Sequence, residues 1–156
     1  QNRDSRTVCF ANVHSVALAA YDERHRLALL SADMVTPDGT PISWTLKRKG
    51  HRTQKRVDGP NMMWSLCANA EAQNVKIGLY GASPQTLKAL SERLRQSFPE
   101  LDIAYICSPP FRELTEAEDQ QICADIARAD IGILFVGLGC PKQEFWIASI
   151  VVAYRR

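Results

Sequence analysis

The second half of the chain alternates short apolar runs with longer amphipathic stretches. The apolar runs predict three strands, at residues 75–80, 101–107 and 131–136. The stretch after the first run predicts a helix, because Leu87, Leu90 and Leu94 recur at helical spacing. Thr115 and Glu118 have the spacing of a capping box, and so predict the start of the next helix. This strand–helix alternation predicts an α/β fold with a Rossmann-like parallel sheet and flanking helices.

The first half is less regular. It predicts a strand at residues 8–11 and helices at 13–20, 22–32 and 61–73, with a turn at Pro37-Asp38-Gly39 and a basic stretch at 47–56. We treat residues 1–156 as a single domain with an N-terminal part at about 1–73. The strand–helix repeat at about 74–150 then forms the second part.

Composition excludes several classes of protein. The chain has 156 residues, 46% of them hydrophobic and 23% charged, which is typical of one soluble domain. Its net charge of +2 is too small to indicate nucleic acid or a membrane by itself. No apolar run approaches the ~20 residues that span a bilayer, and the polar start does not resemble a signal peptide. These features favour a cytoplasmic location.

Cysteine and histidine usage gives no sign of a metal site. The five cysteines are an odd number without a C-x-x-C pair, which favours buried thiols in a reducing compartment. The three histidines are scattered without the spacing of metal ligands. We therefore expect neither a bound metal nor a cofactor.

The loops after the three strands are the candidate ligand site. In open parallel sheets, ligands bind beyond the carboxyl ends of the strands, where helix N-termini favour anions. A diphosphate is the expected ligand, although ordinary tight turns without a ligand are an equally simple interpretation of the same residues. The predicted contacts in these loops are Gly81, Ala82, Ser83, Gly137, Gly139 and Pro141.

Three polar residues open the last predicted helix. Lys142 opposes the helix dipole there, which indicates a phosphate partner. Gln143 offers both a donor and an acceptor to a base or a sugar hydroxyl. Glu144 is either a ligand contact or only a favourable charge in the first helical turn.

Asp38 is the candidate general base. A carboxylate on a rigid turn can accept the proton of an attacking hydroxyl. Aspartate is also a common residue in Pro-Asp-Gly turns, so a purely structural role explains it as well.

Several familiar motifs are missing. The sequence contains no P-loop, no G-x-G-x-x-G fingerprint and no G-x-S-x-G elbow. The basic stretch at 47–56 is either a solvated helix end and loop, or a surface that attracts a diphosphate acceptor or an anionic membrane. Nucleic acid is not expected, because no aromatic residues interleave with the basic ones.

Four segments resemble the WecG/TagA/CpsF family of bacterial glycosyltransferases (glycosyltransferase family 26). They are ADMVTPDG at 32–39, KRVDGPNMMW at 55–64, KIGLYGASP at 76–84 and VGLGCPKQEFWI at 136–147. They occur in family order, and the last is the most specific.

The resemblance implies transfer of N-acetylmannosamine or a similar hexose from a UDP-sugar to an undecaprenyl-diphosphate-linked acceptor at the inner membrane face. Such products enter enterobacterial common antigen, teichoic acid or exopolysaccharide. Asp38 matches the family's proposed base, and Asn12 matches a pocket asparagine near the end of the first strand. Gln143 matches the glutamine of the P-K-Q-E segment, and Arg56 and Gly59 match the arginine and glycine before the donor-side helix. Because the chain has no D-x-D carboxylate pair, we expect a metal-independent mechanism. With Asp38 as the base for the acceptor hydroxyl, we expect transfer with inversion.

The chain also departs from the family pattern. Phe10 and Asn61 stand where threonine and aspartate are common, and SIVVAYRR replaces a longer C-terminal segment, which suggests C-terminal truncation. The alternative function is therefore a truncated, inactive domain that still binds a nucleotide sugar. A dinucleotide-dependent enzyme is a third, weaker hypothesis.

Overall fold

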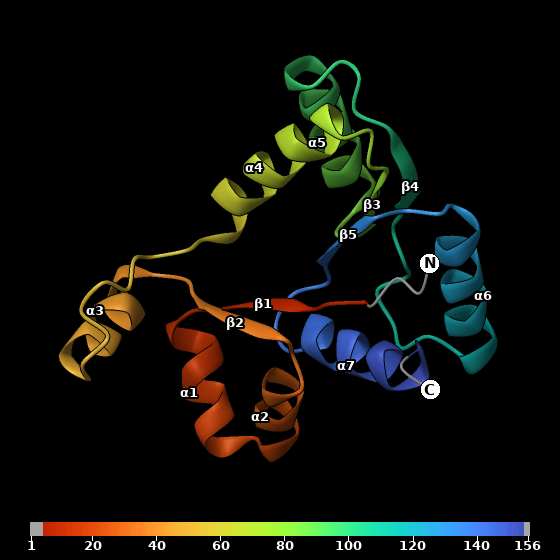
Figure 1. Ribbon diagram of the computed structural model, residues 1–156. Helices are drawn as coiled ribbons and strands as arrows, with labels where there is room; N and C mark the ends of the chain where they lie inside the picture. Colours follow the sequence, from red (N-terminus) through yellow and green to blue (C-terminus); the bar gives the residue numbers. More distant parts are fainter. Residues whose placement is uncertain (1–4, 155–156) are drawn as a thin grey trace. The chain divides into compact units, whose positions relative to one another are not determined.

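A computed structural model describes residues 5–154, with side chains up to residue 150 (Figure 1). Within this range the chain forms two compact units. The first unit consists of residues up to 62 together with those from 139 onward, and the second consists of residues 63–138. The division of a single domain at about 73/74, expected from sequence, remains a prediction.

The first unit contains a parallel strand pair. Strand β1 (Val8–Ala11) pairs with β2 (Met34–Pro37), with Val8 opposite Met34 and Ala11 opposite Pro37. Helices α1 (Val13–Tyr21) and α2 (Glu23–Leu30) connect these strands and pack on each other. Helix α3 (Thr40–Arg48) follows β2, and α7 (Lys142–Tyr154) packs against α2 (Figure 1).

The second unit is built on a three-stranded parallel sheet. Its strands are β3 (Ile77–Gly81), β4 (Ile103–Cys107) and β5 (Ile133–Gly137), in the order β4-β3-β5. Helices α5 (Pro84–Ser97) and α6 (Glu116–Arg128) connect them, and α4 (Gly59–Ala72) leads into β3 from the first unit. The parallel α/β arrangement predicted from strand–helix alternation is therefore confirmed.

Helices cover both faces of this sheet. Ile77 and Leu79 of β3 pack with Cys67 of α4 and Leu94 of α5 in one hydrophobic core. Tyr80 occupies the alternate position of β3, as expected for side chains that alternate between faces. Burial raises the pKa of Tyr80, and so do the nearby Cys107 of β4 and Asp119 and Cys123 of α6. Helix α6 therefore lies near the face opposite α4 and α5.

The helix starts predicted from sequence are confirmed. Ser83 Oγ accepts the amide of Thr86 at 3.1 Å, with Pro84 as the first residue of α5. Thr115 and Glu118 form the predicted capping box at the start of α6. Local polar residues thus set these helix boundaries, because they satisfy amides that have no partner within the helix.

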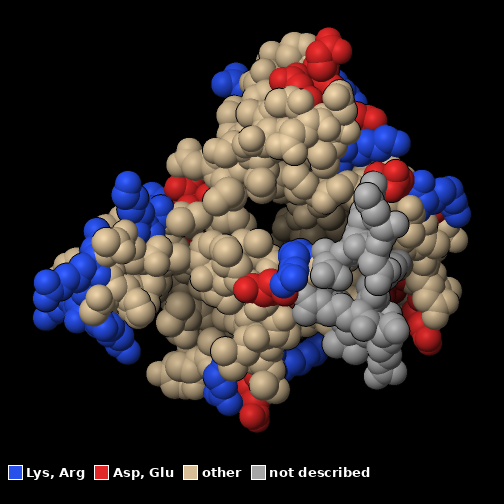
Figure 2. Space-filling model, viewed as in Figure 1, with Lys and Arg blue, Asp and Glu red and all other residues tan. Residues whose placement is uncertain are grey.

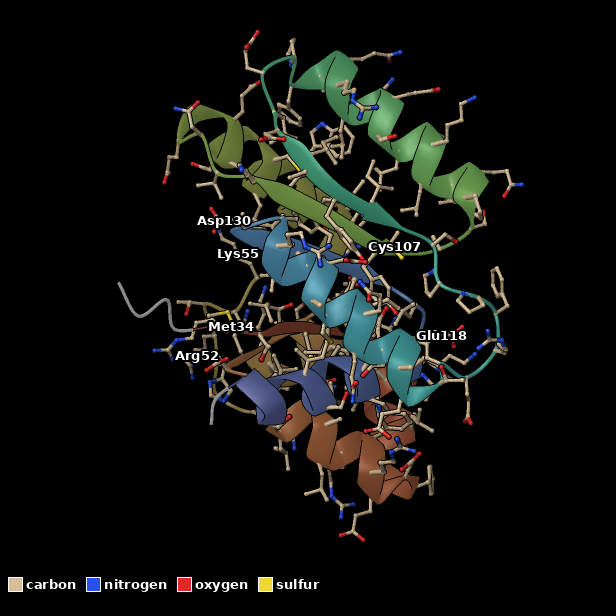
Figure 3. All side chains as sticks on the ribbon, turned by 90° about the vertical axis from the view of Figure 1, so that its right-hand side faces the viewer. Met34, Arg52, Lys55, Cys107, Glu118 and Asp130 are labelled. Carbon is tan, nitrogen blue, oxygen red and sulfur yellow. The ribbon has the colours of Figure 1, made fainter. Side chains whose placement is uncertain are left out.

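Glu118 makes this cap sensitive to pH. Glu118 lies in the first turn of α6 (Figure 3). Hydrogen bonds from Arg112 and from the Thr115 amide lower the Glu118 pKa to about 2, from a usual value of 4.5. A lowered folded-state pKa adds stability above pH 4.5, and this stability is lost as the pH falls toward 2.

We expect Glu118→Gln to lower the melting temperature at neutral pH. This gap in melting temperature between the variant and the wild type should close as the pH falls toward 2. Thermal melts across this pH range measure the gap, with Glu92→Gln on the exposed side of α5 as the control; a gap that stays constant with pH would contradict the prediction.

Two elements were not predicted. Residues 34–37 form strand β2, although Pro37 indicated a turn, and residues 40–48 form helix α3. Pro37 is compatible with β2 because proline is tolerated on strands that do not need its amide as a donor. The three strands of the second unit each begin two residues later than predicted, at Ile77, Ile103 and Ile133.

Among the described residues, no helix combines the length and apolar character needed to cross a bilayer.

Candidate active site

Asp38 lies at the carboxyl end of β2. Its amide donates to the carbonyl of Ala11 at 2.9 Å, which continues the β1–β2 pairing. On the other side, the carbonyl of Pro37 accepts the amide of Val57 at 3.1 Å. Gly39 then turns the chain into α3 with a φ of +117°, a conformation that glycine adopts readily. Asp38 is therefore held between two backbone segments at a strand end, the position where parallel sheets carry their ligands.

Arg56 bridges Asp38 to a second carboxylate. Its guanidinium nitrogens lie 3.7 Å from Asp38 Oδ1 and 3.8 Å from Asp58 Oδ2. The side chain of Asp38 is 24% exposed and that of Arg56 is 52% exposed, so both are accessible to a ligand. Sequence analysis predicted Asp38 and Arg56 as site residues, and the structure brings them together.

Asp58 was missed as a site residue. Its Oδ1 accepts the amide of Asn61 at 3.0 Å, so it caps the first turn of α4. This hydrogen bond is the main reason that the pKa of Asp58 is lowered, with a further bond from the Asn61 side chain and the charge of Arg56. The helix-opening segment Asp58-Gly59-Pro60 was visible in the sequence, but nothing local showed that Arg56 would join it to Asp38.

Asn12 follows β1 at the same edge as Asp38, because Ala11 and Pro37 are opposite each other in the pair. Its Oδ1 accepts the amide of Ser15 at 3.0 Å and caps α1. The described part of the chain shows no partner for its amide nitrogen, which leaves that group available to a ligand. Asn12, Asp38, Arg56 and Asp58 form what we call the strand-end cluster of the first unit.

The turn before α7 holds the predicted residues Gly139 and Pro141, and Lys142 and Gln143 open the helix itself. The amide of Gly139 donates to Gln143 Oε1 at 3.2 Å, and Gln143 Nε2 donates to Glu144 Oε1 at 3.1 Å. The polar ends of Gln143 thus bond within its own segment. Lys142 is exposed at the first position of the helix. Glu144 is only 2% exposed, so its side chain faces the interior of the first unit.

The strand ends of the second unit bring together Gly81, Ala82 and Gly137. Gly81 and Gly137 are opposite each other in the β3–β5 pair, and the amide of Ala82 donates to the Gly137 carbonyl at 2.8 Å. Ser108, which follows β4, donates from Oγ to the Ala82 carbonyl at 2.7 Å. The loops after all three strands therefore meet at one edge, as the parallel arrangement predicts.

The glycines at this edge have different physical roles. Gly81 has a φ of +110°, and a Cβ there would lie 2.5 Å from the Gly137 carbonyl carbon. Close strand packing thus explains Gly81 without a ligand. A Cβ at Gly137 or Gly139 would meet nothing within 4 Å, so these two positions leave open space beside the backbone.

The basic stretch begins at the C-terminus of α3. Lys47 and Arg48 lie in the last turn of this helix, and the chain then continues as an exposed loop. Lysine and arginine side chains gather over α3 in Figure 2. The Arg48 guanidinium also stacks over the exposed ring of Trp44, 4.7 Å from its centroid. The predicted solvated helix end and loop is confirmed, and its role toward an acceptor or membrane remains a proposal.

Comparison with known proteins decides the family. Residues 1–153 match the profile described as Glycosyl transferase WecG/TagA/CpsF family. The chain belongs to this family. The family resemblance inferred from the four sequence segments is therefore confirmed, and the strand-end cluster belongs to a WecG/TagA/CpsF protein.

Three relatives of this WecG/TagA/CpsF chain share the name N-acetylglucosaminyldiphosphoundecaprenol N-acetyl-beta-D-mannosaminyltransferase. The Bacillus spizizenii protein is 30% identical over 129 residues, which cover 83% of this chain and 48% of the relative. The Bacillus subtilis protein is 29% identical over 133 residues, covering 85% and 50%. A Staphylococcus aureus protein is 24% identical over 149 residues, covering 96% and 57%. The chain spans about half the length of these curated relatives.

Proposed function

We propose that this chain acts in glycosyl transfer, moving N-acetylmannosamine or a similar hexose from a UDP-sugar to an undecaprenyl-diphosphate-linked N-acetylglucosamine. Family membership and the names of the relatives support the reaction class and the acceptor. The observation that carries the proposal is the position of Asp38. The Asp38 carboxylate is accessible and lies at a strand end beside Arg56. In a chain of a glycosyltransferase family, this position suits a group that accepts a proton from the acceptor.

In this mechanism Asp38 is the general base. The acceptor hydroxyl attacks the anomeric carbon of the donor, and its proton passes to an Asp38 carboxylate oxygen. The bond from the anomeric carbon to the UDP oxygen breaks, and UDP leaves with the electron pair. Attack opposite the leaving group inverts the anomeric configuration. Arg56, 3.7 Å from Asp38, orients the carboxylate toward the hydroxyl.

In this proposal, protein groups bind the donor diphosphate without the help of a metal ion. In the second unit, the α5 N-terminus after Ser83 supplies amides of the kind that stabilise phosphate oxygens. Lys142 of the first unit is an exposed cation and a separate candidate for a phosphate contact. Gly137 and Gly139 leave room for a ligand to approach the backbone. Because the acceptor is lipid-linked, the reaction takes place at a membrane surface, where the basic side chains of α3 favour anionic headgroups.

A transfer assay tests the proposal. Purified chain is mixed with UDP-N-acetylmannosamine and a short-chain lipid-diphosphate N-acetylglucosamine, and the product is followed by mass spectrometry. We expect a disaccharide product of inverted anomeric configuration, formed at a rate that added Mg²⁺ or Mn²⁺ does not increase. Donor binding without product would instead support a nucleotide-sugar-binding domain without catalysis, and stabilisation by NAD but not by UDP would support a dinucleotide enzyme.

A further inference from the structure

Three side chains that can bind a metal meet inside the first unit. His25 of α2, Cys140 of the turn before α7 and Glu144 of α7 each place one ligand atom within 4.8 Å of the others. We call these residues the His25 cluster. His25 Nε2 lies 4.0 Å from Cys140 Sγ, although the two residues are 115 positions apart. The scattered histidines gave no sign of this cluster in the sequence.

The cluster contains polar atoms that lack a partner. His25 is 0% exposed and Glu144 is 2% exposed. His25 Nδ1 and Glu144 Oε2 are both buried without a hydrogen-bond partner among the described residues. Leaving a buried carboxylate oxygen unsatisfied is costly, so a cation bound to Glu144 would stabilise the fold.

We propose that the His25 cluster binds a zinc ion. Imidazole nitrogen, thiolate sulfur and carboxylate oxygen are the three ligand types that zinc prefers, whereas Mg²⁺ and Ca²⁺ take oxygen ligands. Zinc–ligand bonds of about 2.0–2.3 Å in a tetrahedron place ligand atoms about 3.3–3.7 Å apart. The observed separations, up to 4.8 Å, exceed these values by about 1 Å, so the three side chains must move closer together around the ion. The double positive charge balances one thiolate and one carboxylate.

The surroundings of the cluster match those of metal ligands. Glu144 Oε1 accepts from Gln143 Nε2 at 3.1 Å, and Gln143 Oε1 in turn accepts the Gly139 amide at 3.2 Å. Such neighbouring hydrogen bonds orient ligands and are usual around protein metal sites. The His25 ring also packs edge-on against Phe145, with centroids 6.2 Å apart. The ligands are therefore held by packing before any ion binds.

Nucleophilic catalysis does not explain the cluster as well. A catalytic cysteine needs a lowered pKa. Here burial and the charge of Glu144 raise the pKa of Cys140. A zinc ion, by contrast, binds the thiolate directly and displaces its proton.

The ion would join elements that are distant in sequence. It would link α2 to the turn and first helical turn of α7, where Gly139 and Gln143 lie. Its role is structural, so the proposal is independent of the transfer reaction and of Asp38.

Metal content and cobalt spectroscopy test the site. The full chain, made without a histidine tag in zinc-supplemented medium, is dialysed and analysed by mass spectrometry for metals. We expect one zinc per chain. Replacing zinc with Co²⁺ should give the visible bands of tetrahedral cobalt and a near-ultraviolet thiolate-to-cobalt band. A chain that retains no zinc above the buffer and shows neither cobalt feature would overturn the proposal.

Variants locate the ion. Cys140→Ser should remove the thiolate band, and Glu144→Gln should weaken cobalt binding about 100-fold or more, since even second-shell losses cost 10–100-fold. The controls are Cys107→Ser and His14→Gln, which change the same residue types outside the cluster and should leave both signals intact. Unchanged spectra and affinity in Glu144→Gln would refute the site even if Cys140→Ser failed to fold.

Discussion

Asp38→Asn is expected to lower kcat for sugar transfer by about 10²–10⁴-fold, the usual contribution of a general base. Asparagine has the same shape as aspartate but cannot accept the proton of the acceptor hydroxyl. The amide of residue 38 still bonds the Ala11 carbonyl, so the strand end keeps its geometry. Affinity for UDP-N-acetylmannosamine should therefore stay close to that of the wild type. Steady-state kinetics and calorimetric titration of the donor measure the two quantities.

Asp58→Asn is the matched control, because Asp58 also lies beside Arg56. Asp58 caps α4 through the Asn61 amide, and asparagine is as good a cap as aspartate. We expect a much smaller loss of kcat in this variant. If the two variants lost activity equally, or if Asp38→Asn lost donor binding along with turnover, the role of Asp38 would be in the ion-pair network and not in proton transfer.

Gly81→Ala is expected to lower the free energy of unfolding by about 2–5 kcal/mol, the sum of left-handed backbone strain and overpacking. The backbone has a φ of +110° there, and the new methyl group would lie 2.5 Å and 2.6 Å from the carbonyl carbon and oxygen of Gly137. These are backbone atoms in the β3–β5 pair, so they cannot rotate away as a side chain would. The melting temperature should fall by on the order of 10 °C. Urea unfolding and thermal melts measure the change.

Variants at two other glycines separate backbone strain from overpacking as causes of the lost stability. Gly50 has a φ of +108° but open space, so Gly50→Ala tests strain alone and should cost about 1–2 kcal/mol. Gly137 has neither a positive φ nor a close neighbour, so Gly137→Ala should change stability little. An effect of Gly81→Ala no larger than that of Gly50→Ala would show that strand contact adds nothing.

The sequence determined most of the second unit. Its strands are continuous apolar runs, and its helix starts are marked by Ser83-Pro84 and by Thr115 with Glu118. These signals are local, since a cap bonds within one turn and an apolar run reports burial directly. Short segments of the chain were therefore enough to predict the parallel α/β fold.

The first unit depended more on tertiary structure. Residues 34–37 end in a proline that indicated a turn at 37–39, and they form β2 only because β1, 26 positions earlier, pairs with them. That pairing gives Asp38 its place at a strand end. Sequence motifs selected Asp38 and Arg56, but their 3.7 Å contact and the participation of Asp58 follow from the fold.

The sequence by itself determined the family and the strand–helix alternation, and it selected Asp38 and Arg56 as candidate site residues. Only the tertiary structure explained why residue 81 is a glycine and showed which buried side chains are in contact. Gly81 is required by the nearby Gly137 backbone, and His25 meets Cys140 across 115 positions. The physical reason is that strand packing and burial depend on segments far apart in the chain, whereas sequence patterns report the preferences of a few neighbouring residues.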